Sequence, residues 1–389
     1  MLACISAATL TGAVGQSVSV EVHVSNGLPG FTIVGLPDAA VRESRDRVPA
    51  ALLSSGLPWP LRRVTVNLAP SGVRKGGAGL DLAVAVGVLV ATGQLPPDCT
   101  ETLAFCGELG LNGSLHHVPG MIALADATTP LELVVPLCDV REAFLVRGDA
   151  VHGVSSLSEL AQILRARGEW PAIPPAPPAP PPPDIPDLAD VRGQALGRHA
   201  LEVAAAGRHH LLMVGPPGSG KTMLAERLPG LLPPLTPEES LTVTRVHSAA
   251  GRPLPDGVLV SHPPFRAPHH SASLVALVGG GSWSLRPGEI SLATLRVLEC
   301  RLRRESLWRH EGRPPSAFCS LIRDSFCPRL RFHQVLLVDV PKRESSSGGA
   351  CGPFPSDEPR LAGAVTAAVR ACGTVIGGLA LLSGTGLRR

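Results

Sequence analysis

Apolar and polar residues alternate along short segments in the first part of the chain. In residues 18–24 every second residue is valine, with serine, glutamate and histidine between. A period of two is typical of a strand with one buried face. Segments 31–34 and 63–68 are also rich in β-branched residues and predict further strands.

Longer segments between these strands have the length and composition of helices. Ala39–Ser54 is one, and residues 80–92 are a second, apolar almost throughout and therefore expected to be buried. Residues 107–115 predict a hairpin, because Asn112-Gly113 suits turn positions with positive φ. Mixed strands and helices predict an α/β fold.

A run of prolines divides the chain at residues 171–183. Proline has no backbone N–H and a fixed φ, so this run predicts a semi-rigid, polyproline-like spacer. An SH3-type ligand has a similar composition, but the position between two ordered segments favours a linker. We expect a domain at 1–168, a linker at 169–186 and a second domain from residue 187.

A glycine-rich loop follows the apolar residues 211–214, which predict a buried strand, and helical composition continues over 221–228. This strand–loop–helix context is what a GxxxxGK[ST] match requires. Glycines let the loop turn its N–H groups toward phosphates, while Lys221 reaches the β- and γ-phosphates and the Thr222 hydroxyl ligates Mg²⁺. The sequence therefore predicts ATP and Mg²⁺ binding, with Lys221 as the catalytic residue, at Gly215, Pro216, Pro217, Gly218, Ser219, Gly220, Lys221 and Thr222.

Charge and cysteine usage narrow the class of protein. The net charge is +3, but residues 294–389 carry +7, which leaves about −4 for the first 293 residues, so charge alone does not predict nucleic-acid binding. Nine cysteines without CxxC or metal spacing indicate reduced thiols in a cytoplasmic protein. The apolar segment 361–382 carries Arg370 near its centre, which argues against a membrane span.

Three motifs give the amino-terminal half a family resemblance. Residues 27–38 read GLPGFTIVGLPD, residues 67–70 read NLAP, and residues 75–82 read KGGAGLDL. These resemble the Lon-protease-like domain at the front of Mg-chelatase-like AAA+ ATPases of the YifB/ComM type. Lon-type hydrolysis needs a Ser–Lys dyad. Here Gly79 stands at the serine position and residues 117–123 contain no lysine, so a scaffold or an interaction domain for DNA or a partner is favoured over a peptidase.

The second half resembles the same family in four segments. They are DVRGQ at 190–194, where AAA+ ATPases contact adenine, PFRAPHHSAS at 264–273, ALVGGG at 276–281 and PGEISLA at 287–293. His269-His270 could bind a metal, but adjacent residues point apart and no third ligand is evident, so a structural or substrate-facing loop is favoured. The resemblance implies a homo-hexameric ring with this region facing its pore, and DNA branch migration in natural transformation.

The resemblance ends after Ala293, inside a motif. Where the family has the Asp-Glu pair of its Walker B strand, this chain has Arg301 and Leu302. Residues 335–339 (VLLVD) have the shape of a displaced Walker B strand but lack the glutamate. The basic, cysteine-rich stretch 294–389 is either a nucleic-acid-binding surface or the product of a frameshift. The break inside a motif favours a frameshift, with an irregular tail.

Three function classes follow from these observations. The favoured one is an AAA+ ATP-binding protein of DNA processing, with an incomplete P-loop domain of which residues 187–293 form the amino-terminal part. Its hydrolysis is impaired, because metal placement and water positioning both need the missing carboxylates. The second is a non-catalytic scaffold with a relic nucleotide site. The third is a motor for magnesium insertion into a porphyrin, against which the Lon-like domain argues.

Overall fold

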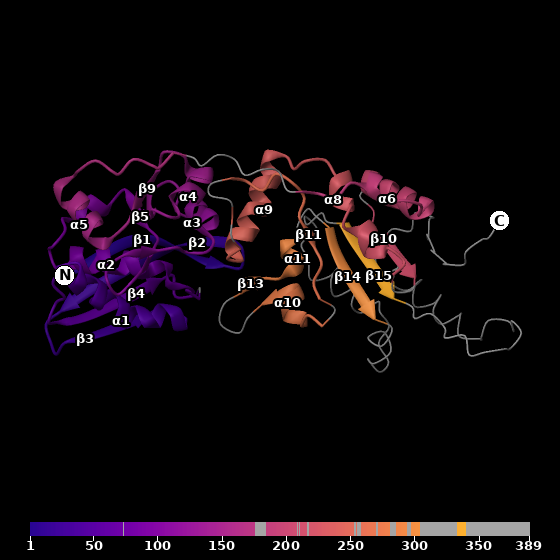
Figure 1. Cartoon of the computed structure of the whole chain (residues 1–389). Coiled ribbons are helices and arrows are strands. Elements are labelled where there is room, and N and C mark those ends of the chain that lie inside the picture. Colours follow the sequence, from indigo (N-terminus) through magenta and orange to yellow (C-terminus); the bar gives the residue numbers. More distant parts are fainter. Residues whose placement is uncertain are drawn as a thin grey trace, which may run out of the picture. The chain divides into compact units, whose positions relative to one another are not determined.

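The structure is a computed structural model of the chain (Figure 1). It describes all residues except 73, 176–183, 208, 210, 216–217, 253, 255–257, 270, 281–284, 294–296, 304–332 and 340–389. Residues 212, 214, 215, 297–303 and 333–339 are described by backbone only. The chain divides into two compact units: the first contains Met1–Pro181, Ser240–Val260 and Gly279–Gly288, and the second contains the remainder.

A seven-stranded sheet of order β3-β4-β2-β1-β5-β8-β9 forms the centre of the first unit. Four of its six strand pairings are parallel, while β1 with β2 and β2 with β4 are antiparallel. Its strands are β1 (Leu2–Thr11), β2 (Val14–Ser25), β3 (Gly30–Val34), β4 (Arg63–Ala69), β5 (Leu103–Phe105), β8 (Glu132–Pro136) and β9 (Val151–Val154).

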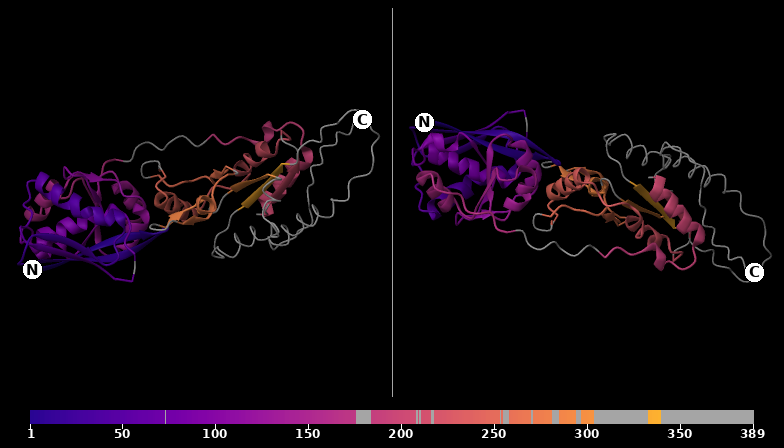
Figure 2. Two further views of the ribbon diagram at one scale, coloured as in Figure 1. Left: turned by 90° about the horizontal axis from the view of Figure 1, so that it is seen from below. Right: turned by 90° about the horizontal axis from the view of Figure 1, so that it is seen from above.

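Helices cover both faces of this sheet, as Figures 1 and 2 show. In β8, Val134 belongs to one apolar cluster, whereas its neighbours Leu133 and Val135 belong to another, because successive side chains of a strand point to opposite faces. One cluster includes residues of α1 (Ala39–Ser54), α2 (Asp81–Ala91) and α5 (Leu157–Ala166); the other includes residues of α3 (Met121–Ala127) and α4 (Val140–Arg147). The α/β prediction is therefore confirmed.

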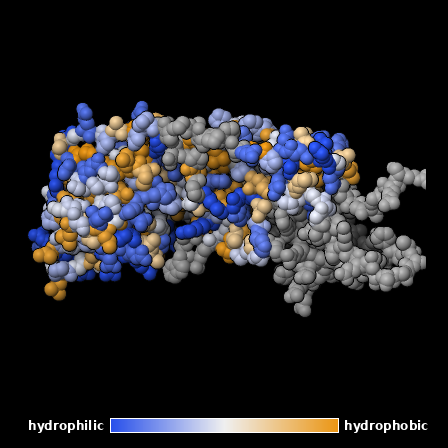
Figure 3. Space-filling model, in the orientation of Figure 1, coloured by the Kyte–Doolittle hydropathy of each residue, from blue (hydrophilic) through white to orange (hydrophobic). Residues whose placement is uncertain are grey.

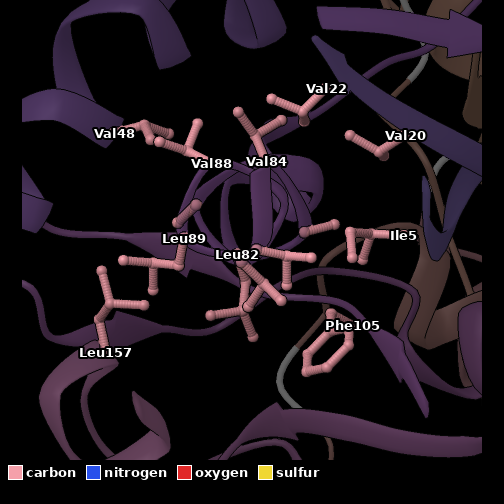
Figure 4. Close-up of a cluster of buried hydrophobic side chains, with 14 of the residues drawn as sticks. Ile5, Val20, Val22, Val48, Leu82, Val84, Val88, Leu89, Phe105 and Leu157 are labelled. Atoms are coloured by element: carbon pink, nitrogen blue, oxygen red, sulfur yellow. The ribbon is translucent and has the colours of Figure 1, made fainter. Parts of the chain in front are cut away.

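Helix α2 is the centre of the larger cluster, and all eleven of its residues are buried (Figure 4). Its apolar composition on every side is typical of a helix enclosed by other elements. Gly87 permits close contact with β2, since a Cβ there would lie 2.5 Å from Val22 Cγ2. The single charged residue, Asp81, lies in the first turn.

The predicted elements of this unit occur where the pattern placed them. The segments at 18–24, 31–34 and 63–68 lie in β2, β3 and β4, and both predicted helices form. The hairpin at 107–115 consists of β6 (Glu108–Leu109) and β7 (Leu115–His116), and Gly113 at its turn has φ of +83°. Strand β1 was not predicted, because residues 3–8, which are small apart from Ile5, lack a regular alternation.

The second unit contains a four-stranded parallel sheet of order β10-β15-β14-β11. Its strands are β10 (Leu211–Gly215), β11 (Phe265–Arg266), β14 (Val297–Arg303) and β15 (His333–Asp339). Strands β14 and β15 belong to the stretch 294–389, for which we expected irregular structure. Four consecutive apolar residues at 335–338 suit a strand between two others. The rest of this stretch lies outside the described residues.

Segment 240–260 belongs to the first unit, although it follows the glycine-rich loop in the sequence. Most of α9 (Pro237–Ala249) lies in it. The Ser248 hydroxyl donates a hydrogen bond to the carboxylate of Glu142 in α4. The Ser248 carbonyl accepts one from the Gly120 N–H. Arg245 forms an ion pair with Asp126 at 3.1 Å. The predicted boundaries at 168, 186 and 293 remain predictions.

The remaining elements complete the described structure. The helices are α6 (Ala195–Gly207), α7 (Lys221–Ala225), α8 (Leu228–Leu231), α10 (Leu274–Val278) and α11 (Glu289–Leu292), the 3₁₀ turns are Ala78–Leu80, Pro97–Thr100 and Leu188–Asp190, and β12 (Gly279–Gly280) pairs with β13 (Arg286–Pro287). On the face shown in Figure 3, polar and apolar surface residues are interspersed over the first unit. Within the described residues, no helix combines the length and apolarity needed to cross a membrane.

One ion pair of the first unit predicts a pH dependence of stability. His117 Nδ1 lies 2.5 Å from Asp139 Oδ1, and this hydrogen bond raises the pKa of His117, with Glu142 and Glu108 adding to the effect. The pair therefore stabilises the fold fully below the unfolded pKa of about 6.5, and the contribution is lost as pH rises through the higher folded pKa. Urea unfolding at pH 6 and pH 8 should show a smaller loss of stability for His117→Gln than for the wild type. Equal losses in the two proteins would contradict this assignment.

Candidate functional site

The glycine-rich loop connects strand β10, at one end of the sheet as far as the chain is described, to the short helix α7. Gly218 and Gly220 have φ of +79° and +83°, which side-chain-bearing residues rarely adopt. Gly220 directly precedes Lys221, the first residue of α7. These two glycines therefore turn the chain from the end of a strand into the start of a helix, as the motif predicts.

Lys221 is 5% exposed, and its ammonium lies 3.3 Å from Ser219 Oγ, so its head is positioned over the loop. Two following residues, Leu224 and Ala225, are fully buried in an apolar cluster that includes Met213 of β10. Packing of α7 against the strand fixes the direction of the helix. The loop and its lysine are thereby anchored at both ends.

The described part of the loop fits a phosphate group. A Cβ built on Gly218 would meet no atom within 4 Å, so the backbone there is open to a close approach. Lys221 supplies a positive charge beside it, and Thr222, half-buried, supplies a hydroxyl of the kind that ligates Mg²⁺ in such loops. Gly215 ends β10, whereas Pro216 and Pro217 lie outside the described residues.

The helix predicted over 221–228 is interrupted. Helix α7 ends at Ala225, and α8 begins at Leu228 with Pro229 in its first turn. In a continuous helix Pro229 could not donate to the Ala225 carbonyl and its ring would clash there, so a break before it is expected. Arg227 spans the break by donating to the Met223 carbonyl at 2.8 Å.

The DVRGQ segment at 190–194 contacts the loop directly. Gln194 Nε2 donates to the Ser219 carbonyl at 2.9 Å. Val191 is buried in the same apolar cluster as Leu224. Proximity in sequence does not reveal this contact, because 25 residues separate its two partners.

Strands β14 and β15 contain the residues on which the Walker B prediction depends. Arg301 and Leu302 lie inside β14, paired with Leu337 and Val338 of β15. Asp339 is the last residue of β15 and is in register with Gly215, the first residue of the glycine-rich loop. The displaced segment 335–339 is therefore the strand that adjoins β10, and it ends where the loop begins.

The segments at 264–273 and 287–293 are joined by one ion pair. Arg266 donates from Nε and Nη2 to the two carboxylate oxygens of Glu289, both at 2.6 Å. A two-pronged bond between arginine and carboxylate fixes orientation as well as distance. It closes the chain into a loop between β11 and α11. Both residues lie in segments that resemble the family, but no local pattern in the sequence indicates that they pair.

The metal alternative at His269-His270 gains no support. His269 Nδ1 lies 2.6 Å from the hydroxyl of Ser271 in the same turn, and the His269 carbonyl accepts from the Ala272 N–H. His270 lies outside the described residues. Across the part of the chain that the structure describes, no group of three His, Cys, Asp or Glu residues could hold a metal ion.

Gly79, at the serine position of the Lon-type dyad, lies next to Val118 of the lysine-free segment 117–123. A Cβ on Gly79 would lie 2.9 Å from Val118 Cγ1, and Gly79 itself is buried. Lys75, also buried, donates to the Pro70 carbonyl, and burial lowers its pKa. The serine position is therefore a glycine packed against Val118, and Lys75 links the motifs at 67–70 and 75–82.

Two family sequence models match the chain. The one described as magnesium chelatase, subunit ChlI, matches residues 187–300, and the one described as subunit ChlI of Mg-chelatase matches residues 20–137. The first match includes the glycine-rich loop and ends in β14, seven residues beyond Ala293. The second lies entirely in the first unit.

Relatives from three bacteria are similar over most of this chain. Rv2897c of Mycobacterium tuberculosis is 46% identical over 73% of the chain, competence protein ComM of Haemophilus influenzae 41% over 76%, and YifB of Escherichia coli 41% over 72%. These matches cover 57%, 59% and 55% of the relatives' own lengths. The chain thus spans little more than half the length of the curated relatives it matches.

Proposed function

The chain belongs to the Mg-chelatase-like family that includes the YifB and ComM proteins, and on that premise we propose that it binds ATP with Mg²⁺ at the loop from Gly215 to Thr222. The observation that carries the proposal is the strand–loop–helix unit. In it, Gly218 and Gly220 adopt left-handed conformations and the Lys221 ammonium lies beside the loop.

Each residue of the site has a separate task in this proposal. The loop N–H groups bind the phosphate oxygens, and Lys221 balances the charge of the β- and γ-phosphates. Thr222 binds Mg²⁺ through its hydroxyl. Bound Mg²⁺ would neutralise part of the charge on the phosphates. The DVRGQ segment at 190–194 lies against the loop through Gln194, which suits its proposed place beside the adenine.

We propose that hydrolysis is impaired. Transfer of the γ-phosphoryl group to water requires carboxylates that place the metal and orient the attacking water. Arg301 and Leu302 replace this pair on β14. Asp339 supports the alternative that 335–339 is a displaced Walker B strand. Its backbone position adjoins Gly215, and its residue type suits Mg²⁺. It could supply one of the two carboxylates but not both.

The proposed process is ATP-driven DNA processing, and the name of the competence protein ComM supports it. Branch migration during natural transformation, by a homo-hexameric ring, is the specific form that the family resemblance suggests. The chain spans only part of these relatives, so ring assembly and DNA binding are proposals in their own right. Free thiols at Cys4, Cys99, Cys106 and Cys138 are compatible with the proposed cytoplasmic location.

The first experiment measures labelled ATP binding to the full chain, with and without Mg²⁺, together with native mass. We expect one ATP per chain and weaker binding after chelation of Mg²⁺. Absence of binding at millimolar ATP would favour the non-catalytic scaffold. Binding of a porphyrin with magnesium would favour the third class, insertion of the metal.

A further inference from the structure

Gln194 has an unusual backbone conformation. Its φ is +53°, and the preceding Gly193 has φ of +71°, so the chain makes two consecutive left-handed steps. Glycine adopts this conformation freely, whereas a residue with a long side chain adopts it at a cost. Such a conformation persists where surrounding contacts stabilise it. Those contacts indicate what the position does.

Gln194 makes two hydrogen bonds that depend on this turn. Its carbonyl accepts from the Arg198 N–H at 2.9 Å, the first turn of α6. Its side-chain amide donates to the Ser219 carbonyl, also at 2.9 Å. The left-handed step therefore starts the helix and directs the amide toward the glycine-rich loop at the same time.

Gln194 contacts Ser219, the loop residue that also contacts Lys221. Ser219 accepts from Gln194 through its backbone carbonyl and lies 3.3 Å from Lys221 Nζ through its hydroxyl. A Cβ on Gly220 would lie 3.5 Å from Gln194 Nε2, so the amide also borders the next residue of the loop. Gln194 and Lys221 thus restrain the same loop residue from two sides.

We propose that Gln194 is a positioning residue that holds the glycine-rich loop in the conformation that binds phosphate. The inference rests on the proposed ATP site and adds a residue outside the loop motif. Gln194 acts on the loop backbone and not on the base. Loss of Gln194 therefore weakens the binding of every ligand that occupies the loop by the same factor, whether or not the ligand carries adenine.

The test compares Gln194→Gly and Gln194→Asn with the wild type in the full chain, using Mg-ATP and inorganic Mg-tripolyphosphate as separate ligands. Glycine relieves the backbone strain but removes the amide, and asparagine tolerates the left-handed conformation but is one methylene too short. We expect both dissociation constants to rise about three- to tenfold, which is the usual effect of losing one hydrogen bond. The unfolding temperature of Gln194→Gly without ligand should equal or exceed that of the wild type.

Each outcome has one interpretation. Wild-type affinity in both variants overturns the inference, and so does weakening confined to ATP, which would place Gln194 at the base. A lower unfolding temperature in both variants, with affinity lost in proportion, would assign it a purely structural role. If the wild type binds neither ligand, the proposed function fails and the inference with it. Binding that Lys221→Ala removes but Gln194→Gly leaves unchanged overturns only the inference.

Discussion

Replacement of Lys221 by alanine should raise the dissociation constant for Mg-ATP at least about a hundredfold. The ammonium lies beside the loop, and removing a charged donor to phosphate costs about 3 kcal/mol or more in a desolvated site. Fluorescence titration with an ATP analogue measures this loss. Because Lys221 is buried, the unfolding temperature of the variant without ligand must be measured beside it.

Glu226→Ala is the matched control for this change. Glu226 follows α7 directly and is exposed, so its loss should leave ATP affinity and stability nearly unchanged. Full ATP affinity in a folded Lys221→Ala variant would show that the nucleotide site lies elsewhere.

The largest expected effect on stability is that of Asp81→Ala, about 3–5 kcal/mol. The Asp81 carboxylate is fully buried and accepts bonds from the Ser44 hydroxyl, from Arg47 Nε at 2.8 Å and from the Leu109 N–H at 3.3 Å. It thereby joins α1, α2 and the hairpin of β6 and β7. Without it, Arg47, whose side chain is 17% exposed, keeps its charge and loses its buried partner.

Glu43→Ala provides the control, because Glu43 pairs with the same arginine at 3.1 Å but is 69% exposed. Exposed ion pairs one helical turn apart contribute only about 0.3–0.5 kcal/mol. Urea unfolding of both variants gives the comparison. Similar losses for the two variants would show that the buried carboxylate is not the hub that its contacts indicate.

The elements that sequence predicts well are those in which local pattern and burial agree. The valines at 18–24 alternate because one face of β2 is buried, and α2 is apolar throughout because it is enclosed. Strand β1 was missed because its small residues carry little periodicity. The motif break at Ala293 favours an irregular tail, although residues 335–339 have the shape of a strand. Strand β14 and the parallel pairing of β15 with β10 and β14 depend on residues far away in the sequence.

In the candidate site, too, the sequence predicts local features but not contacts between distant segments. The loop motif predicts the glycine conformations and the place of Lys221, because its chemistry lies within eight consecutive residues. The contact of Gln194 with Ser219 and the pair of Arg266 with Glu289 join residues 25 and 23 positions apart. Such contacts follow from topology, which no local pattern specifies.

The central claim is that this chain binds ATP but hydrolyses it poorly, and one measurement tests it directly. Phosphate release and ATP binding should be measured on the same sample at saturating Mg-ATP, with Lys221→Ala as the blank and Asp339→Asn beside it. We predict stoichiometric binding with turnover below about 0.1 per second, roughly a hundredfold under that of a typical enzyme. Lys221-dependent turnover near 10 per second would contradict the claim, and its loss in Asp339→Asn would identify β15 as the source of the missing carboxylate.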